Sequence, residues 1–278
     1  PGSRRVAADW FPNLITNGGL DRMGTDQYCG ACVVGTGSTA PANTDTVLAA
    51  FLAGSGTIQT SSSGAQGSAP YYGYHRRTFR FAAGVATGNL TEIGITNTGA
   101  FINTTPLYSR ALILDGAGTP TTLTILADEI LDANYELRSY PYLTDITTTP
   151  TINGVVTTVI LRAAIVTNAY WGSAIFGAPG IDSGSSALYS GAIGAITSQP
   201  TGLLANFIGS SSGTYTPGSY SLSWKLSVGV GNSWTIGSGY FVTTRGVYQI
   251  DFAPDLTLLN TQTFVLTISM TWARETIP

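Results

Sequence analysis

Alternation of apolar and polar side chains recurs along this chain and restricts its fold more than any other feature. In residues 221–230, apolar side chains occupy every second position from Leu222 to Val230, with serines and Lys225 between them. A strand points successive side chains to opposite faces, so a period of two is typical of a half-buried strand. The same alternation occurs in residues 131–137, 247–252 and 263–272. It predicts antiparallel sheets, which commonly bury one face and expose the other.

Other strands are predicted from runs of β-branched and apolar residues, which favour extended chain over helix. These runs cover residues 76–81, 90–96, 107–114, 121–126 and 155–166. The sequence Asp-Gly-Ala-Gly at 115–118 predicts a hairpin loop, and Asn153-Gly154 is typical of a type I′ turn. One short helix is expected over residues 47–51, after the capping side chains of Asn43, Thr44 and Asp45. The expected fold is therefore an all-β antiparallel sandwich with one short helix.

Two stretches rich in Gly, Ser and Ala interrupt this pattern, at residues 53–70 and 170–219. Large apolar residues recur in both, unlike in a flexible linker. The second stretch is long for a loop, and we interpret it as an excursion that contacts a neighbouring subunit. Its aromatic residues are the candidate assembly contacts: Trp171, Phe176, Tyr189 and Phe207.

The domain organisation follows from where these stretches lie. One interpretation has an N-terminal β lobe at 1–145, with a candidate attachment segment at 1–50, and a C-terminal lobe at 146–278 that includes the excursion. The alternative is a single large sandwich that the excursion interrupts. A chain of 278 residues is long enough for either arrangement.

The composition is unusual in its charge. Only 10% of residues are charged, against about 25% in ordinary soluble domains, and Lys225 is the only lysine. A free monomer usually stays soluble through interspersed surface charges, whereas a subunit buried among neighbours does not need them. We therefore expect a protein that works by assembly. A secreted β-protein with a surface rich in Thr and Ser is the alternative.

Charge and hydropathy also bear on partners and location. The net charge is −3 and no basic block is present, so we expect no nucleic-acid partner. The longest apolar candidate, residues 155–166, is too short to span a bilayer, so no membrane insertion is expected. The basic residues at 4–5 are not followed by the apolar core of a signal peptide, and we expect no export signal in this sequence.

Candidates for chemistry are sparse. Cys29 and Cys32 match the C-x-x-C pattern, but their flanks predict extended chain, not the helix that would activate a thiol. We interpret both as small buried residues. His75 is the only histidine, so it is the only candidate imidazole base for a catalytic triad. The Gly-Ser-Ser-Ser-Gly sequence at 209–213 lies in a Ser/Gly stretch without the strand and helix of a nucleophile elbow.

The densest acidic cluster comprises Asp128, Glu129 and Asp132. Paired carboxylates could hydrolyse glycosides, but such a row on a strand is more typical of a solvated sheet face with cross-strand pairs. We predict no catalytic, cofactor-binding or metal-binding residues. A polysaccharide-degrading enzyme that uses Asp128, Glu129 or Asp132 is one alternative function.

Several segments together resemble a known class of protein. Asn-Leu-Ile-Thr-Asn-Gly-Gly-Leu-Asp at 13–21 is followed by Val-Gly-Thr-Gly-Ser-Thr-Ala-Pro at 34–41. The pattern continues in shorter segments, at residues 45–46, 48, 71–72, 79–81, 88–94, 109–113, 126–131, 135–138, 248–252 and 272–274. This ensemble resembles tailed-bacteriophage tail, baseplate and tail-fibre structural proteins. Residues 170–219 lie outside the resemblance.

The resemblance implies a non-enzymatic virion protein, assembled in the host bacterial cytoplasm, whose partners are copies of itself and other tail proteins. It implies no catalytic residues and does not distinguish baseplate, tip, collar and fibre. The main alternative is a carbohydrate- or receptor-binding β-module, at a fibre tip or in a secreted adhesin. Host-surface glycan would then be the partner, and exposed tyrosines would bind it, with Tyr71, Tyr72 and Tyr74 as first candidates.

Overall fold

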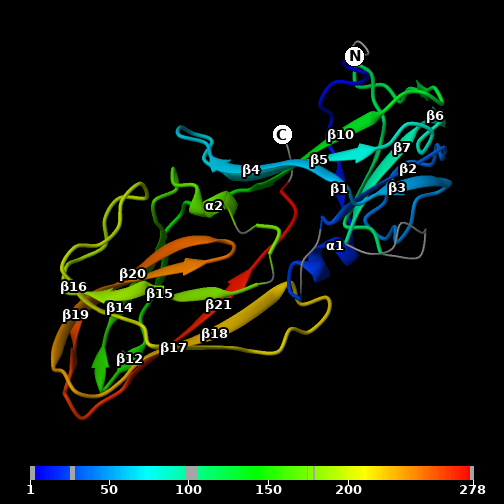
Figure 1. Cartoon of the computed structure of the whole chain (residues 1–278). Coiled ribbons are helices and arrows are strands. Elements are labelled where there is room, and N and C mark those ends of the chain that lie inside the picture. The colour runs from blue at the N-terminus through cyan, green and yellow to red at the C-terminus, as the bar shows by residue number, and fades with distance from the viewer. Residues whose placement is uncertain (1–3, 26–28, 98–105, 174, 178, 276–278) are drawn as a thin grey trace.

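The computed structural model describes residues 4–25, 29–97, 106–173, 175–177 and 179–275. Strands make up 48% of the chain and helices 4%, so the all-β prediction is confirmed. The strands form two groups of sheets at opposite ends of an elongated molecule, as Figure 1 shows. One group uses residues 14–139 and the other residues 146–271, and no sheet formed by the described strands draws on both groups.

The N-terminal lobe contains a five-stranded and a three-stranded antiparallel sheet with a shared core. Phe79, Phe81 and Tyr135 from one sheet and Val34 and Ile95 from the other belong to this core. The five-stranded sheet runs β1 (Leu14–Ile15), β8 (Ser109–Leu112), β7 (Glu92–Thr96), β2 (Ala31–Gly35), β3 (Phe51–Ser55). The three-stranded sheet runs β10 (Leu131–Ser139), β5 (Gly73–Phe81), β4 (Ile58–Ala65), and β6 (Gly88–Leu90) pairs with β9 (Leu123–Ile125).

The C-terminal lobe is a second sandwich, with six strands in one sheet and three in the other. Leu226 and Phe264 from the smaller sheet meet Phe241 and Phe252 from the larger one in the core. The larger sheet runs β11 (Ile146–Thr148), β14 (Thr158–Ala163), β20 (Gly246–Leu258), β19 (Trp234–Thr243), β15 (Ile181–Tyr189), β16 (Leu203–Asn206). The smaller sheet runs β17 (Gly209–Ser212), β18 (Ser221–Val228), β21 (Phe264–Thr271), and β12 (Thr151–Ile152) pairs with β13 (Val155–Val156).

Two short helices lie where the lobes meet, α1 (Asn17–Arg22) and α2 (Tyr170–Ser173). α2 contacts β5 closely, because a Cβ atom added to Gly172 would lie only 2.2 Å from the Tyr74 carbonyl oxygen. Gly73 is equally restricted, since its added Cβ would lie 2.1 Å from the Trp171 carbonyl oxygen. A glycine on each side therefore allows backbone-to-backbone contact between the helix and the strand.

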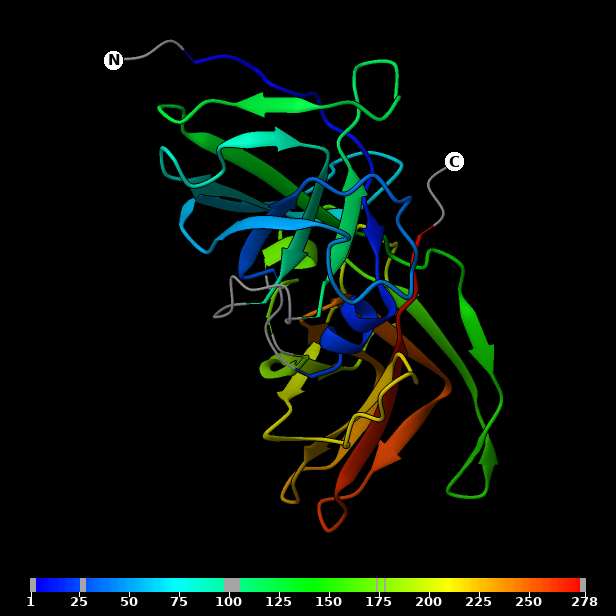
Figure 2. The ribbon, with the colours of Figure 1, turned by 90° about the vertical axis from the view of Figure 1, so that its right-hand side faces the viewer.

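α1 is attached to the C-terminal lobe by side chains that donate to main-chain carbonyls within the helix and on either side of it. Trp272 Nε1 donates to the Leu20 carbonyl at 2.9 Å, and an Arg245 nitrogen donates to the Met23 carbonyl at 2.8 Å. Arg274 donates to the Ile15 carbonyl at 2.5 Å. Figure 2 shows the chain after β21 running past α1 to reach these positions.

The predicted strands and turns are largely found. Asn153 and Gly154 both have positive φ, 50° and 81°, as a type I′ turn requires, and they join β12 to β13. Asp115 receives the Ala117 and Thr119 amides in the predicted loop at 115–118. However, the flanking β8 and β9 belong to different sheets.

Three expectations are wrong. Residues 47–51 form a turn and the start of β3, not a helix. The alternation at residues 247–252 predicts Gln249 on the polar face of its strand, yet Gln249 is fully buried because its amide binds the backbone of residues 194–195, which covers that face. Residues 170–219 are not a loose excursion, since they supply α2, β15, β16 and β17 to this chain's own fold.

The turn at 47–51 is explained by a buried carboxylate. Glu92 has no solvent exposure, and its oxygens accept the amides of Gly37, Ala49 and Ala50 at 3.0, 3.1 and 2.7 Å. Arg110, 2% exposed, donates its Nε to the same carboxylate at 2.9 Å. Arg110 also binds the Asp45 carboxylate at 2.6 Å, so Asp45 is not available to cap a helix. We call Glu92, Arg110 and Asp45 the buried ion cluster.

Replacing Glu92 by Gln should destabilise the protein by about 3–5 kcal/mol, because the buried Arg110 would lose the fully buried one of its two counter-charges. Urea unfolding of both proteins measures this difference. Asp145→Asn is the control, since Asp145 pairs with Arg162 at 2.5 Å in a partly exposed position. The control should lose far less stability. Equal losses in the two variants would contradict the role given to Glu92.

Candidate interaction surfaces

The outer face of the β10-β5-β4 sheet presents rows of polar side chains that run across its strands. Thr78 lies opposite Thr60 and Asn134, and its hydroxyl is 2.7 Å from both the Thr60 hydroxyl and the Asn134 Oδ1. In another row, Glu136 lies opposite Arg76 and forms an ion pair with it. Cross-strand pairs of this kind fix side-chain positions on a sheet. The face is therefore an ordered array of hydrogen-bonding groups.

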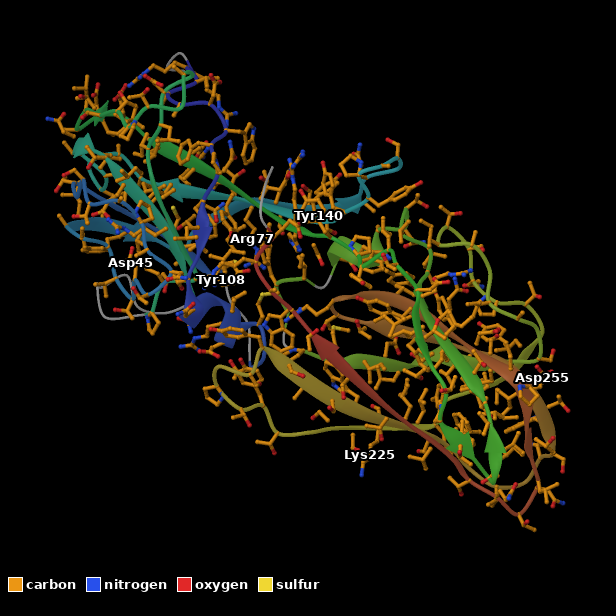
Figure 3. The ribbon with its side chains drawn as sticks, turned by 180° about the vertical axis from the view of Figure 1, so that it is seen from behind. Asp45, Arg77, Tyr108, Tyr140, Lys225 and Asp255 are labelled. Carbon is orange, nitrogen blue, oxygen red and sulfur yellow. The ribbon has the colours of Figure 1, made fainter. Side chains whose placement is uncertain are left out.

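Three tyrosines gather at the end of this array that lies nearest the C-terminal lobe. The ring of Tyr72 lies 6.4 Å from that of Tyr74 and 5.4 Å from that of Tyr140, centroid to centroid. The Arg138 guanidinium lies 4.6 Å from the Tyr72 ring centroid, within cation–π range. Figure 3 places Tyr140 close to the junction of the lobes. We call Tyr72, Tyr74, Tyr140, Arg76 and Arg138 the tyrosine–arginine platform.

The platform includes two of the three predicted receptor contacts. Tyr72 and Tyr74 belong to it, whereas Tyr71 packs against the core of the C-terminal lobe, which contains Trp171. Sequence reasoning missed Tyr140. The register of β10 and β5, which the structure supplies, pairs Ser139 with Gly73 and so places Tyr140 beside Tyr72.

The acidic cluster is engaged in ion pairs, except for exposed Asp128. Asp132 receives two hydrogen bonds of 2.7 Å from Arg80, and this hydrogen bonding holds the pKa of Asp132 below its usual value. Glu129 accepts the Leu126 amide at 2.8 Å and binds Arg5 at 3.0 Å, and both contacts lower its pKa. A general acid needs a raised pKa, so these two carboxylates suit pairing better than proton donation.

The Arg80–Asp132 pair should make stability depend on acid pH. Because the pKa of Asp132 is lower in the folded state than its usual 3.8, the pair stabilises the protein fully above that value. Its contribution is lost as the pH falls through the lowered pKa. Asp132→Asn should remove this part of the pH dependence, measured by urea unfolding between pH 2 and 7. Arg80→Met should remove it equally, and an unchanged dependence in both variants would refute the assignment.

His75 lies on the opposite face of β5, beside the junction. Its Nε2 is 2.8 Å from the Ser61 hydroxyl, and its ring centroid is 4.4 Å from that of Phe176. Burial first and Arg77 second lower the pKa of His75. The surroundings thus favour neutral imidazole.

Cys29 and Cys32 have free thiols with no solvent exposure. Burial raises the pKa of both thiols, which disfavours the reactive thiolate. Cys32 lies within β2, in extended chain. Within the described residues, no three His, Cys, Asp or Glu side chains are grouped so that they could hold a metal ion.

The candidate assembly contacts are core residues of this chain. Trp171, Phe176, Tyr189 and Phe207 are 1%, 3%, 8% and 3% exposed. Trp171 donates its indole N–H to the Ala164 carbonyl at 3.0 Å, which fixes it inside the junction. Side chains buried this deeply present no surface to a second subunit, so the interpretation of these four residues as assembly contacts is not retained.

The outer face of the β17-β18-β21 sheet is exposed and nearly free of charge. Its side chains are mostly hydroxyls, and Lys225 is its only charged residue. Val265 is 56% exposed on the same face, and the Ser223 and Ser269 hydroxyls are 2.7 Å apart. We call this surface the hydroxyl face; it comprises Ser211, Ser223, Lys225, Ser227, Val265, Thr267, Ser269 and Thr271. Figure 3 shows Lys225 pointing away from the body of the lobe.

One edge of the hydroxyl face is an open strand. β21 pairs with β18 and, among the described strands, with no other. It contains no proline and no charged residue over Phe264–Thr271. Soluble monomers usually protect such edges with Lys, Pro or a covering segment, because an unpaired edge can add a strand from another chain.

Comparisons with known proteins yield no relative: no family model, no curated protein and no solved structure matches this chain. No helix among the described residues has the length and apolar character needed to cross a membrane.

Proposed function

We propose that this protein is a structural subunit that assembles in symmetric copies, and specifically a component of a bacteriophage tail. The hydroxyl face with its open β21 edge is the observation that carries the proposal. A hydroxyl that finds a partner costs little to bury, whereas an unpaired lysine or carboxylate costs several kcal/mol. Permanent interfaces are accordingly depleted of charge at their centres. This face has the composition expected of a surface that another subunit covers.

The assignment to a tail rests on two further points. The scattered segments described above, from residues 13–21 to 272–274, resemble tail, baseplate and tail-fibre proteins. An elongated, two-lobed all-β subunit also suits a structural role, because it offers separate surfaces at its two ends. Under this proposal the partners are copies of the chain and other tail proteins, and the protein resides in the virion. Mass spectrometry of purified tailed-phage particles that encode the chain tests this assignment, and its absence from intact particles would exclude it.

Assembly should fail when charge is placed on the hydroxyl face. Val265→Lys adds an ammonium beside the β21 edge, and burying it against a neighbour would weaken self-association at least about tenfold. Analytical ultracentrifugation over a concentration series measures the change. Val85→Lys is the matched control, since Val85 is also exposed, 46% against 56% for Val265, but lies in the other lobe. If Val265→Lys associates like the wild type, the hydroxyl face is not the interface.

A second candidate function, glycan binding, is favoured by the tyrosine–arginine platform. Tyrosine rings present flat apolar faces to sugar rings, and adjacent guanidinium groups donate to hydroxyls. The side chains of Arg76 and Arg138 are 52% and 47% exposed, so their donors can reach a ligand. The ligand would be a saccharide of the host surface.

Under this second candidate, Tyr72→Ala and Tyr140→Ala should each weaken binding to host-surface polysaccharide by about tenfold, the value of one aromatic contact. Isothermal titration calorimetry with purified polysaccharide measures the affinity. Tyr142→Ala serves as the control, because Tyr142 is 62% exposed but does not belong to the platform. Absence of binding by the wild type, or equal losses in all three variants, would reject the platform as a glycan site.

A further inference from the structure

An open groove separates β10 from strands β7 and β8 in the N-terminal lobe. Its volume is about 1740 Å³, and apolar side chains of the lobe's core line it, including Ile93, Ile113 and Leu131. β10 forms its other wall along the edge that faces away from β5, and among the described strands only β5 pairs with β10. The groove therefore combines apolar lining with unpaired backbone groups, the features that an extended peptide segment needs.

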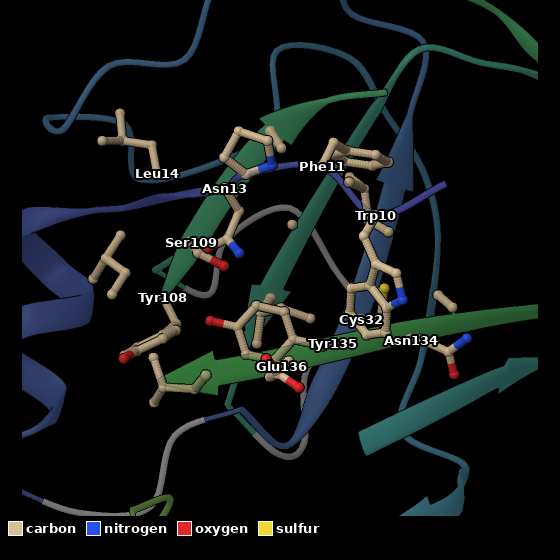
Figure 4. Close-up of a pocket in the computed structure, with 18 of the residues that line it drawn as sticks. Trp10, Phe11, Asn13, Leu14, Cys32, Tyr108, Ser109, Asn134, Tyr135 and Glu136 are labelled. Atoms are coloured by element: carbon tan, nitrogen blue, oxygen red, sulfur yellow. The ribbon is translucent and has the colours of Figure 1, made fainter. Parts of the chain in front are cut away.

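The chain's own N-terminal segment lies across this groove. We call residues 4–13 the arm; they form neither helix nor strand. Figure 4 shows Trp10, Phe11 and Asn13 of the arm on one side of the pocket, with Tyr135 and Glu136 of β10 opposite. Phe11 and Ala8 pack against the core.

The arm is held loosely. In the described part of the chain, its hydrogen bonds are donated by the side chains of Arg4 and Arg5, and none is a backbone–backbone bond. Trp10 and Val6 remain 66% and 82% exposed, although an apolar groove lies directly beneath the arm. An arm with two large apolar side chains in water lacks the stabilisation that burial of those side chains would contribute.

Charge complementarity identifies what the groove binds. Its rim carries the densest acidic cluster of the sequence, Asp128, Glu129 and Asp132, and the arm carries Arg4 and Arg5. Arg5 binds Glu129 at 3.0 Å and Arg4 approaches Asp132 at 3.4 Å. Every copy of the chain carries both the acidic rim and the basic arm, so the arm of one copy matches the groove of another as well as its own.

We propose that this groove receives the arm of a second copy, so that subunits exchange arms when they assemble. An extended arm of this length reaches about 33 Å, enough to cross to an adjacent subunit. In a neighbour's groove the arm approaches from outside and can run along the open edge of β10, forming the backbone bonds absent from its present position. The inference deepens the proposed assembly function, because it names a contact between copies that is separate from the hydroxyl face.

Charge reversal at the Arg5–Glu129 pair tests the exchange in the full-length chain. In R5E alone and in E129R alone, an exchanged arm would meet a groove of like charge. In a pair made of one R5E copy and one E129R copy, each exchanged arm meets a groove of opposite charge. In an equimolar mixture, native mass spectrometry should therefore find mixed pairs about fivefold above the statistical proportion. The expected excess is modest because a single exposed ion pair contributes little free energy.

The matched control uses Arg162 and Asp145, which pair at 2.5 Å within the C-terminal lobe. A mixture of R162E and D145R should give the statistical proportion, because that contact stays within one chain. Thermal unfolding of each single variant verifies that it folds.

A statistical proportion in the R5E and E129R mixture would overturn arm exchange, since it means that each arm serves its own groove. So would monomeric wild-type protein at all concentrations. Failure here leaves the proposed assembly function intact if Val265→Lys still weakens self-association, so the two proposals fail separately.

Discussion

The N-terminal lobe is organised around one buried carboxylate. Glu92 has no contact with water, and three backbone amides and Arg110 satisfy its oxygens. Those amides belong to residues 37, 49 and 50, at the two ends of the long connection between β2 and β3. A buried charge without partners is very unfavourable, so the connection has to pass close to Glu92. That path determines where β3 begins.

Charge is used in two ways in this protein. Inside, it joins distant parts of the chain, as in the buried ion cluster and in the arginines that bind carbonyls at the junction. On the outside it forms cross-strand pairs over the β10-β5-β4 sheet, yet it is almost missing from the hydroxyl face. The two ends of the molecule thus present different surfaces, one with paired charged side chains and aromatic rings and one with hydroxyl groups. Under the proposed assembly function, these two surfaces would suit two different kinds of neighbour.

Local sequence patterns predicted the strands, because a half-buried strand requires alternating apolar and polar residues. Alternation located β10, β18, β20 and β21, because a strand with one buried face imposes that pattern on its own residues. The helix expected at 47–51 failed, since Glu92, more than forty positions away, takes the amides that a helix would use. Gln249 was misplaced because a segment from residues 194–195 covers its face. The four candidate assembly contacts were misplaced because they belong to the hydrophobic cores of this chain. In each case, contacts between residues far apart in the sequence determine the conformation or the burial, and local sequence patterns do not reveal such contacts.

Around α1, side chains of the C-terminal lobe bind backbone of the N-terminal lobe at the junction. Trp272, Arg245 and Arg274 all donate to main-chain carbonyls in or next to α1. A carbonyl is present whatever residue carries it, so these three hydrogen bonds depend on the path of the chain and not on its side chains. Asn17 and Asp21 are exceptions, because their side chains accept hydrogen bonds from Arg274 and Tyr215; other substitutions in α1 that keep the helix should leave the carbonyl contacts intact. Most side chains of α1 can therefore vary in sequence while these three carbonyls keep the helix in place on the C-terminal lobe.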